Sequence, residues 1–408
     1  MNAKKHASPG GAKENLWMHP TLRLTLEIIT ALGTIASLSF YVLALCGLVA
    51  FLKRNRQNPH PAPLPPISIL KPLKGTDPEM WQSFLSHAEQ NYTNFELIFG
   101  VSDPADPACE VVARLQKQFP DRTIKLIVCD RALGANIKVS NLAQMLPHAR
   151  HEILLVNDSD IRVEPGYLQE VIAPLADPQV GLVTCLYRGE PASTLGSQLE
   201  ALSIATDFIP GVLSARFLEK GLHFGLGSTL AFRRASLAAI GGFESILDYL
   251  ADDYELGRRI AATGKRIELS PDTVTTFLPA YTLRQFWQHQ LRWSRTIRDA
   301  RPAGYIGLIF TFGLPWSLAM LIAARGSTWA LILFALTCAL RVGVGSATAS
   351  AVLNHRMTLR GIFLLPLRDL IAPFVWAAGL VGNRIHWRGD DFYLKDGRLS
   401  KSKLQNSG

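Results

Sequence analysis

Cysteine is scarce in this sequence, and its few residues are not arranged for cross-linking or for metal binding. The 408 residues include five cysteines, an odd number, and none of them form a CxxC pair. Two of them, Cys46 and Cys338, lie inside apolar segments. Disulfide frameworks and zinc sites need paired, regularly spaced cysteines. The cysteine content therefore argues against both and fits a reducing compartment.

Familiar nucleotide-binding and nucleic-acid-binding motifs are also missing. The sequence contains no Walker motif, no dinucleotide-binding motif and no internal repeat. Acidic residues are outnumbered 33 to 42 by Lys and Arg, which gives a net charge of +9. Such a charge attracts nucleic acid, an anionic membrane surface or a phosphorylated substrate. Because many basic residues flank apolar segments, we expect the partner to be a membrane and not nucleic acid.

Charge is absent from a long stretch near the N-terminus. Residues 28–52 are 25 uncharged, mostly apolar residues, and about 20 suffice to cross a bilayer. We expect a transmembrane helix at 24–52, between a disordered segment at 1–23 and a basic, proline-rich linker at 53–66. The segment is too long to be a standard signal peptide, and it lacks the cleavage site of one. The basic cluster that follows it, Lys53, Arg54 and Arg56, predicts that the next domain faces the cytosol.

Apolar segments return in the C-terminal part, where 304–382 is expected to form membrane helices. Residues 304–324 and 328–345 predict a transmembrane hairpin with a polar turn between them. The third stretch, 361–382, contains Arg368, Asp369 and two prolines. A full crossing would place the basic tail at 383–408 outside, so a non-spanning segment is favoured. The protein is thus predicted to be an integral membrane protein. In a bacterium, we expect it in the inner membrane.

The middle of the chain, residues 67–282, has the pattern of an α/β domain. Short β-branched runs alternate with amphipathic helical stretches; the runs are at 67–70, 95–101, 124–128, 152–157 and 180–185, and the helices at 78–90, 106–118, 135–146 and 166–176. This alternation predicts a mostly parallel sheet covered on both faces. Ligands bind such sheets beyond the carboxyl ends of the strands.

Acidic residues follow two of these predicted strands. Asp158 and Asp160 come directly after the strand that ends at Asn157, and carboxylates so placed suit Mg²⁺ or Mn²⁺ bound together with a diphosphate. The alternative is that these residues form an ordinary Asp- and Ser-rich turn that binds no metal. Asp103 ends another strand, where it either contacts a nucleotide or caps a turn before Pro104.

Further acidic residues open a helix at Asp252 and Asp253. Helix capping and the helix dipole favour acids in a first turn. The alternative is that one of them is a general base, because an acceptor hydroxyl must lose its proton as it attacks a sugar. The spacing alone does not decide between the two.

Basic and aromatic residues gather on an amphipathic helix expected at 283–301. His289 and Arg292 share one face of this helix beside Trp293, where they either anchor an interfacial helix or hold a leaving diphosphate. Lys71 and Lys138 lie in loops that suit donor phosphates, although a solvated surface lysine is the simpler explanation. The loop 225–228 is expected to be a tight turn, and the apolar stretch 199–217 a buried or acceptor-side helix, with a further crossing as the alternative.

Taken in order, these motifs resemble lipid-acceptor glycosyltransferases with a GT-A fold, most closely the ceramide glucosyltransferase family. The resemblance covers about residues 27–390 and is carried by ISILKPLKGTDP (67–78), VSDPADPA (101–108), GANIKVSNL (134–142), NDSDIRVEPGYL (157–168), GLGSTLAFRR (225–234), LADDYELGRRI (250–260) and HQLRW (289–293). The ordered set is more specific than any one of its members.

The resemblance implies a role for each motif. Asp103 is expected at the uridine, Asp158 and Asp160 at the metal and donor, and Asp253, the aspartate before the tyrosine, as the base. His289, Arg292 and Trp293 are expected to support the diphosphate and the acceptor. The family motif usually begins with Gln or Arg, so His289 is a departure that makes this contact sensitive to pH.

The resulting hypothesis is an inverting enzyme that transfers a hexose from a UDP-sugar to the hydroxyl of a membrane lipid. The first candidate for the donor is UDP-glucose. Ceramide is one acceptor; a hopanoid receiving N-acetylglucosamine is the alternative. A processive polysaccharide synthase shares these motifs but needs more membrane helices than the sequence offers. A non-catalytic lipid-binding protein would be expected to lack one of the acidic sites.

Overall fold

The computed structural model describes residues 20–55, 65–354, 357–387 and 389–401. Residues 1–19, which make up most of the segment expected to be disordered, lie outside this range. The proline-rich part of the expected linker, 56–64, and the end of the basic tail, 402–408, lie outside it as well.

Within the described residues, the middle of the chain forms an eight-stranded sheet in the order β3-β2-β1-β4-β7-β6-β8-β5. The strands β3, β2, β1 and β4 are mutually parallel, and β6 is parallel to β8, whereas β7 and β5 pair antiparallel. The bounds are β1 Ile67–Pro72, β2 Phe95–Val101, β3 Thr123–Val128, β4 Ile153–Val156, β5 Ile161–Arg162, β6 Val180–Glu190, β7 Leu230–Arg233 and β8 Arg266–Phe277. The predicted α/β class with a mostly parallel sheet is confirmed.

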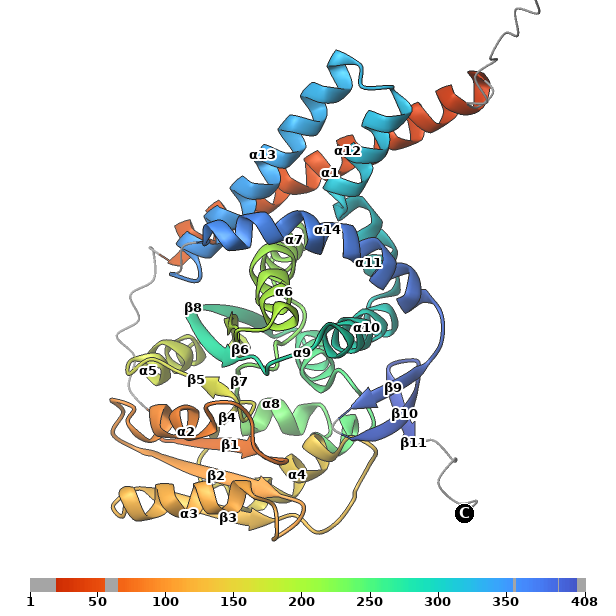
Figure 1. The fold of residues 1–408 in the computed structure, drawn as a ribbon. Coiled ribbons are helices and arrows are strands. Elements are labelled where there is room, and N and C mark those ends of the chain that lie inside the picture. The colour runs from red at the N-terminus through yellow and green to blue at the C-terminus, as the bar shows by residue number, and fades with distance from the viewer. Residues whose placement is uncertain (1–19, 56–64, 355–356, 388, 402–408) are drawn as a thin grey trace, which may run out of the picture.

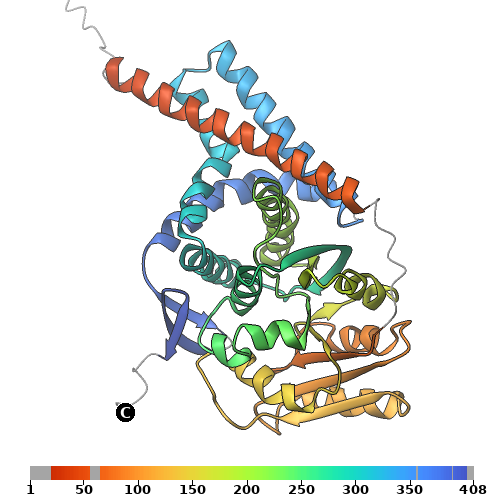
Figure 2. The same ribbon diagram turned by 180° about the vertical axis from the view of Figure 1, so that it is seen from behind.

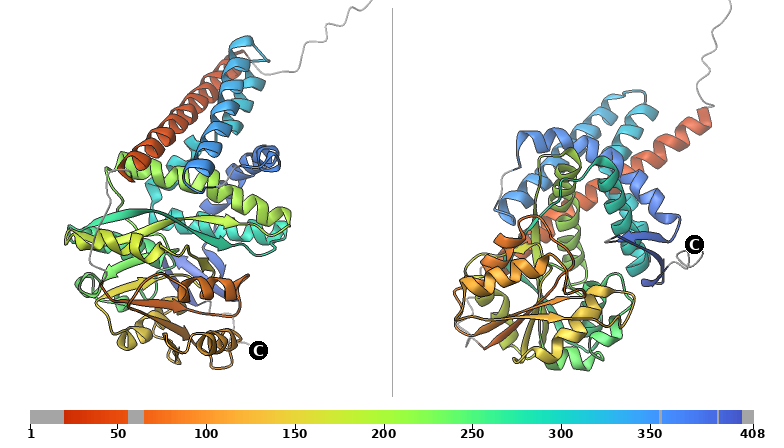
Figure 3. Two further views of the ribbon diagram at one scale, coloured as in Figure 1. Left: turned by 90° about the vertical axis from the view of Figure 1, so that its left-hand side faces the viewer. Right: turned by 60° about the horizontal axis from the view of Figure 1, so that its bottom comes forward.

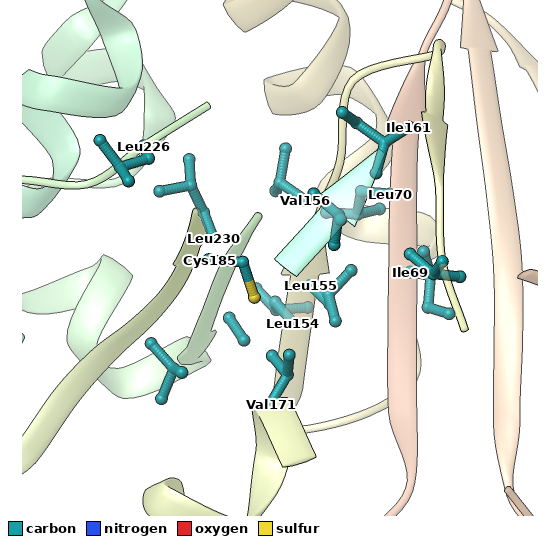
Figure 4. Packing of buried hydrophobic residues seen from close by; sticks show 14 of the residues in the cluster. Ile69, Leu70, Leu154, Leu155, Val156, Ile161, Val171, Cys185, Leu226 and Leu230 are labelled. Atoms are coloured by element: carbon teal, nitrogen blue, oxygen red, sulfur yellow. The ribbon is translucent and has the colours of Figure 1, made fainter. Parts of the chain in front are cut away.

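The core of the domain follows from strands that are apolar on both faces. Every residue of β1 and β2 is buried, as expected of strands covered by helices on both sides. Figure 4 shows side chains of β1, β4 and β7 packed together, with Cys185 of β6 among them. Leu48 and Phe51, from the end of the first helix, belong to the same buried cluster, so that helix is anchored in the domain.

Helices lie on both sides of the sheet, and all of them except α8 occupy stretches that were predicted to be helical. They are α2 Met80–Ala88, α3 Ala108–Gln118, α4 Ile137–Met145, α5 Tyr167–Ile172, α8 Arg234–Ala239 and α9 Asp252–Ala262. Asn136 begins α4, because its side chain accepts a hydrogen bond from the Val139 amide. The chain thus enters α4 at a defined angle, two residues before Lys138.

Apolar helices stand apart from the sheet on one side of the molecule (Figure 1). In the described part of the chain, four helices are long and apolar enough to cross a membrane, and a pair bent by 50° at Phe312 makes a possible fifth. The helices of this half are α1 Pro20–Asn55, α6 Leu195–Ser203, a π-helix at Ile204–Phe208, α7 Ile209–Leu218, α10 Leu283–Ala300, α11 Pro302–Gly307, α12 Gly313–Ala323, α13 Thr328–Ala351 and α14 Leu359–Leu380.

These helices do not all run in the same direction. The start of α1 and the turn between α12 and α13 lie at the end of the molecule farthest from the sheet (Figure 1). The turn is formed by Arg325 and Gly326, both with positive φ. Helix α14 instead lies between this group and the domain, as Figure 3 (left), which looks along it, shows. It packs mainly against α10, and also against α6 and α12.

A second, three-stranded sheet follows α14, where only a basic tail was expected. Its strands are β9 Arg384–Trp387, β10 Asp390–Lys395 and β11 Arg398–Lys401. Its apolar face forms a separate small core from Ile385, Phe392, Leu394 and Leu399, closed by Leu250 of the α/β domain. Figure 2 shows this sheet beside the α/β domain.

Candidate active site

The turn after β4 carries the first two acidic residues of the site. Asn157 is buried, and its amide donates to the Ser228 carbonyl at 2.7 Å and to the Tyr167 hydroxyl at 2.9 Å. Lys71 lies beneath the turn with no exposed surface and donates to the Asp158 carbonyl at 2.9 Å. The buried contacts hold Asp158 and its neighbours at the carboxyl end of β4.

The placement of Lys71 gives it a supporting position in this structure. Burial lowers its pKa to about 7, and this effect is partly opposed by the nearby Asp160 and Asp158. His87 lies 3.5 Å from its amine. Lys71 therefore holds the turn in this structure, and its expected contact with a donor phosphate stays a prediction.

Lys138 connects three separate parts of the chain. Its amine lies 2.8 Å from Asp158 Oδ1 and 3.1 Å from Asp252 Oδ2. The contributing elements are α4, the turn after β4 and the start of α9. Burial raises the pKa of Asp252, and Lys138 opposes this rise. One ammonium group therefore holds two carboxylates that are far apart in the sequence.

Asp253 lies beside the same group. A Cβ atom at Gly227 would be 3.1 Å from Asp253 Oδ2 and 3.4 Å from Asp158 Oδ2, so both carboxylates approach this glycine. Burial and then the neighbouring Asp252 raise the pKa of Asp253 to about 6, against the opposing effect of Lys138. A carboxylate with a pKa near the working pH is suited to accept a proton. Gly227 belongs to the loop 225–228, which was expected to be a tight turn, so this loop lines the acidic cluster.

Asp160 and Asp77 complete the cluster. Burial, then Asp158, raises the pKa of Asp160 to about 6, and Asp77 adds to this rise. The Thr276 hydroxyl donates to Asp160, and the Ser159 hydroxyl donates to Asp77. Asp77 was not among the predicted site residues, although it lies in the first of the recognised motifs, ISILKPLKGTDP.

The acidic cluster has the chemistry of a site for a divalent cation that shares its ligands with a substrate. Among the described residues, no three Asp, Glu, His or Cys side chains are arranged as a complete metal cage. Asp158 and Asp160 are near enough for one to raise the pKa of the other. A cation would relieve this repulsion, and Mg²⁺ commonly takes one or two carboxylates and completes its shell with phosphate oxygens and water. The two residues fit a metal bound in this way.

Asp103 lies apart from these residues. It follows β2, which is separated from β4 by β1, and its side chain is exposed. Its carboxylate accepts a hydrogen bond from the Ala105 amide at 2.8 Å, as in an ordinary turn. The structure therefore brings together Asp158, Asp160, Lys138 and Asp253, and places Asp103 on an exposed turn at the carboxyl end of a nearby strand.

The predicted residues of α10 form an aromatic group with residues from elsewhere. The helix begins with a capping box between Thr282 and Gln285. The His289 ring stacks on Tyr281 with centroids 5.4 Å apart and lies 5.9 Å from the Trp293 ring. Trp293 in turn packs edge-on against Phe208 of the π-helix. Arg292 acts electrostatically on Tyr281.

A buried carboxylate, Glu200 of α6, was missed. It lies 3.1 Å from His289 Nδ1 and accepts a hydrogen bond from Gln290 at 2.8 Å. The only sequence signal was an acidic residue within the apolar stretch 199–217, which suggests a buried partner but does not identify it.

Comparison with known proteins gives a consistent result. The family model described as glycosyl transferase family 21 matches residues 30–400. Ceramide glucosyltransferase 1 of Caenorhabditis elegans is 25% identical over 402 residues, which cover 94% of this chain and 84% of that protein. Ceramide glucosyltransferase 3 of the same organism is 23% identical over 90% of this chain and 82% of its own length.

A solved structure supports the fold. The mannosyltransferase PcManGT from Pyrobaculum calidifontis, in complex with GDP-Man and Mn²⁺, superimposes with a TM-score of 0.51. The match covers 87% of this chain and 96% of that chain at 22% sequence identity. The likeness is one of fold, a GT-A domain with additional helices.

Proposed function

The chain belongs to glycosyl transferase family 21, and on this premise we propose that it transfers glucose from UDP-glucose to the hydroxyl of a membrane lipid with inversion at the anomeric carbon. The observation that carries the proposal is the convergence of Asp158, Asp252 and Asp253 around Lys138, at the carboxyl end of β4. Relatives that match over most of their length are named ceramide glucosyltransferases, which favours a ceramide-like acceptor.

We assign the general base to Asp253. Its raised pKa, about 6, makes it a stronger base than an ordinary aspartate while leaving it ionised at neutral pH. Its carboxylate takes the proton of the acceptor hydroxyl as the oxygen attacks the sugar from the face opposite the diphosphate. Lys138 holds Asp252 and Asp158 beside it and limits the repulsion between the three carboxylates.

Donor binding is assigned to the turn after β4 and to Asp103. Asp158 and Asp160 would hold Mg²⁺ or Mn²⁺, which supplies positive charge to the diphosphate as the bond to the sugar breaks. Asp103, on the exposed turn after β2, would contact the uridine. Arg292 would add a fixed positive charge on the leaving-group side, and Trp293 an apolar surface for the acceptor.

The acceptor side is assigned to the face of the molecule where α6, α10 and α14 meet. Helix α14 packs on α10 and α6, which carry His289 and Glu200, and lies between the domain and the hairpin of α12 and α13. A lipid anchored in the bilayer would present its hydroxyl there. We place α14 at the membrane surface and the α/β domain in the cytosol.

The test of this function is the replacement of Asp253. Purified protein in detergent is given UDP-glucose, Mn²⁺ and ceramide, and UDP release that depends on the lipid is measured. Asp253→Asn should lower turnover at least about 100-fold, since general base catalysis contributes about 10² to 10⁴. Near-normal turnover in this variant would remove Asp253 from the mechanism.

Asp272→Asn is the matched control for the base. Burial also raises the pKa of Asp272 to about 6, but its acidic neighbours are Glu170 and Glu164, outside the cluster. We expect this variant to keep its turnover. An equal loss in both variants would mean that removing a buried carboxylate damages the fold and not the chemistry.

Membranes containing the protein also identify the substrates. Each UDP-sugar is supplied in labelled form, and the product is characterised by mass spectrometry. A hexosylceramide supports the proposal as stated, an N-acetylglucosaminyl hopanoid replaces its donor and acceptor, and a polymer would point to a processive synthase. Failure of UDP with Mn²⁺ to raise the melting temperature would favour a non-catalytic protein, because a ligand of the native state must stabilise it.

A further inference from the structure

The three-stranded sheet that follows α14 is paired with the turn that leads into α9. This turn comprises residues 248–251, and α9 begins at the next residue. The Leu399 amide of β11 donates to the Asp248 carbonyl at 2.6 Å, and the Leu250 amide donates to the Gly397 carbonyl at 3.0 Å. The turn therefore pairs with the edge of the sheet as a further strand would.

Side chains reinforce this pairing. Leu250 is 6% exposed and lies in the small core with Leu394 and Leu399, which are 0% and 4% exposed. The Arg398 guanidinium lies over the Tyr249 ring, 5.0 Å from its centroid, and its Nε donates to the Tyr249 hydroxyl at 3.3 Å. A displacement of the turn would expose Leu250 and break both backbone hydrogen bonds. The sheet therefore stabilises one position of the turn.

The sheet is itself fixed to α10 (Figure 1). Arg298 of this helix donates to the Gly382 carbonyl at 3.0 Å and to the side-chain oxygen of Asn383 at 2.9 Å, in the segment between α14 and β9. Asp299 accepts a hydrogen bond from the Gly397 amide at 3.3 Å. Gly397 thus contacts α10 through its amide and the turn through its carbonyl, so the sheet connects the two.

The first turn of α9, which carries Asp253, is not fixed by its own N-cap residue. That residue is Ala251, which has no side-chain oxygen to accept from the free amides of the helix, and helix ends without such a cap fray. On the side of α4, the Asn136 side chain donates to the Tyr249 carbonyl at 2.7 Å. The turn is thus held between the start of α4 and the C-terminal sheet, and its position determines where Asp253 lies.

We propose that the sheet β9–β11 is a positioning element for the general base, which holds the turn 248–251 and through it the Asp253 carboxylate. The proposal rests on the proposed function, because it takes Asp253 as the base. A misplacement of a catalytic group by about 1 Å costs about 10²-fold in rate. The donor residues belong to the turns after β4 and β2, so a displaced Asp253 should slow the transfer and leave donor binding in place.

The experiment compares two buried leucines in the full-length protein. Leu399→Ala removes a side chain from the small core against the turn, and Leu237→Ala on α8 removes an equal one, 1% exposed, from the main core. Lipid-dependent UDP release gives kcat at a temperature below the unfolding of every variant, and calorimetry gives the affinity for UDP-glucose with Mn²⁺.

Leu399→Ala should lower kcat about tenfold or more and keep the UDP-glucose affinity within about twofold, whereas Leu237→Ala should keep its kcat. Leu399→Met, which restores most of the lost volume, should recover kcat. Equal kcat in Leu399→Ala and Leu237→Ala would overturn the proposal, and so would a loss of donor affinity that accounts for the whole effect.

Action through the base is tested by non-additivity. In an Asp253→Asn background, Leu399→Ala should have little further effect on turnover, because the group that the sheet positions no longer acts as a base. An equal loss in both backgrounds would overturn the proposal. If Leu399→Ala does not fold, Arg398→Gln takes its place in the same cycle, since Arg398 is exposed and contacts Tyr249. Lys395→Gln, at an exposed position on β10, is its control and should be neutral.

The outcomes also separate this inference from the proposed function. If the natural chain releases no UDP with a lipid acceptor, or if Asp253→Asn keeps its turnover, the proposed function fails and this inference fails with it. If the natural chain is active, Asp253→Asn is not, and the variants of the sheet keep their kcat, only the present inference fails.

Discussion

At the scale of single residues, the raised pKa of Asp253 means that its ionised carboxylate destabilises the folded protein. Its pKa is about 6 in the folded protein against an ordinary value of 3.8. The folded state therefore binds the proton more tightly than the unfolded state. The stability linked to this proton is fully present below pH 3.8 and is lost as the pH rises through 6.

Asp253→Asn is therefore expected to be more stable than the natural chain at pH 7.5 and equally stable near pH 4. The amide lacks the charge that burial and Asp252 disfavour. Thermal unfolding at the two pH values measures the difference, and a lower melting temperature at pH 7.5 would contradict it. In the natural chain, turnover should fall as the pH drops through 6, because Asp253, the proposed base, becomes protonated.

Gly227 is the second position at which one residue decides the shape of the site. A Cβ atom there would lie between the Asp253 and Asp158 carboxylates, at 3.1 and 3.4 Å from their nearest oxygens. We expect Gly227→Ala to lower turnover about tenfold or more, because displacing a catalytic group by a fraction of an ångström is costly. Gly166→Ala, where nothing lies within 4 Å of the added carbon, should be neutral. Turnover with UDP-glucose and ceramide compares the two, and equal turnover would contradict the expectation.

At the scale of elements, a group of charges explains how α14 is held. Arg341 of α13 donates to Asp369 of α14 at 2.6 Å and lies 3.0 Å from Asp207 of the π-helix. Arg368 of α14 lies 3.0 Å from the other oxygen of Asp207. These pairs account for Arg368 and Asp369 in an apolar segment without requiring that the segment cross the membrane.

Removal of one member of this group should be more damaging than removal of a pair. Arg341→Met leaves Asp369 buried without its cation, and such changes cost about 3–5 kcal/mol. Arg341→Met combined with Asp369→Leu should recover most of that loss. The measurement is thermal unfolding in detergent, with Arg360→Met, at an exposed arginine, as the neutral control. A double variant less stable than the single one would contradict this account.

At the scale of the whole molecule, the apolar helices and the sheet lie at opposite ends. The start of α1 and the α12–α13 turn share the end away from the sheet (Figure 1). At its other end α1 is tied to the domain by Arg54, which lies 2.6 Å from Glu268. This arrangement suits a protein that holds its active site close to a bilayer.

The proposed orientation predicts which positions a membrane-impermeant thiol reagent reaches. In a cysteine-free background, Asp121→Cys on the α/β domain should react in inside-out bacterial vesicles and not in right-side-out ones. Arg325→Cys, at an exposed position in the α12–α13 turn, should show the reverse. Both cysteines reacting from the same side would overturn the proposed insertion of the hairpin.

The sequence by itself was sufficient for the elements whose signal is local. The apolar run that ends at Leu52 predicted α1, and the β-branched runs at 67–70 and 95–101 predicted the buried strands β1 and β2. Each pattern is a property of neighbouring residues, since helices and strands repeat over a few positions. The resemblance of ordered motifs then selected Asp158 and Asp253 from many turn and capping acids.

Only the tertiary structure decided which groups meet. It paired Lys138 with Asp158 and Asp252, placed Glu200 against His289, and closed a C-terminal sheet around Leu250. These contacts join residues far apart in the chain, so no local periodicity encodes them. The burial of Lys71 and Glu200 also results from contacts between distant parts of the chain. The residues next to them in the sequence do not reveal that they are buried.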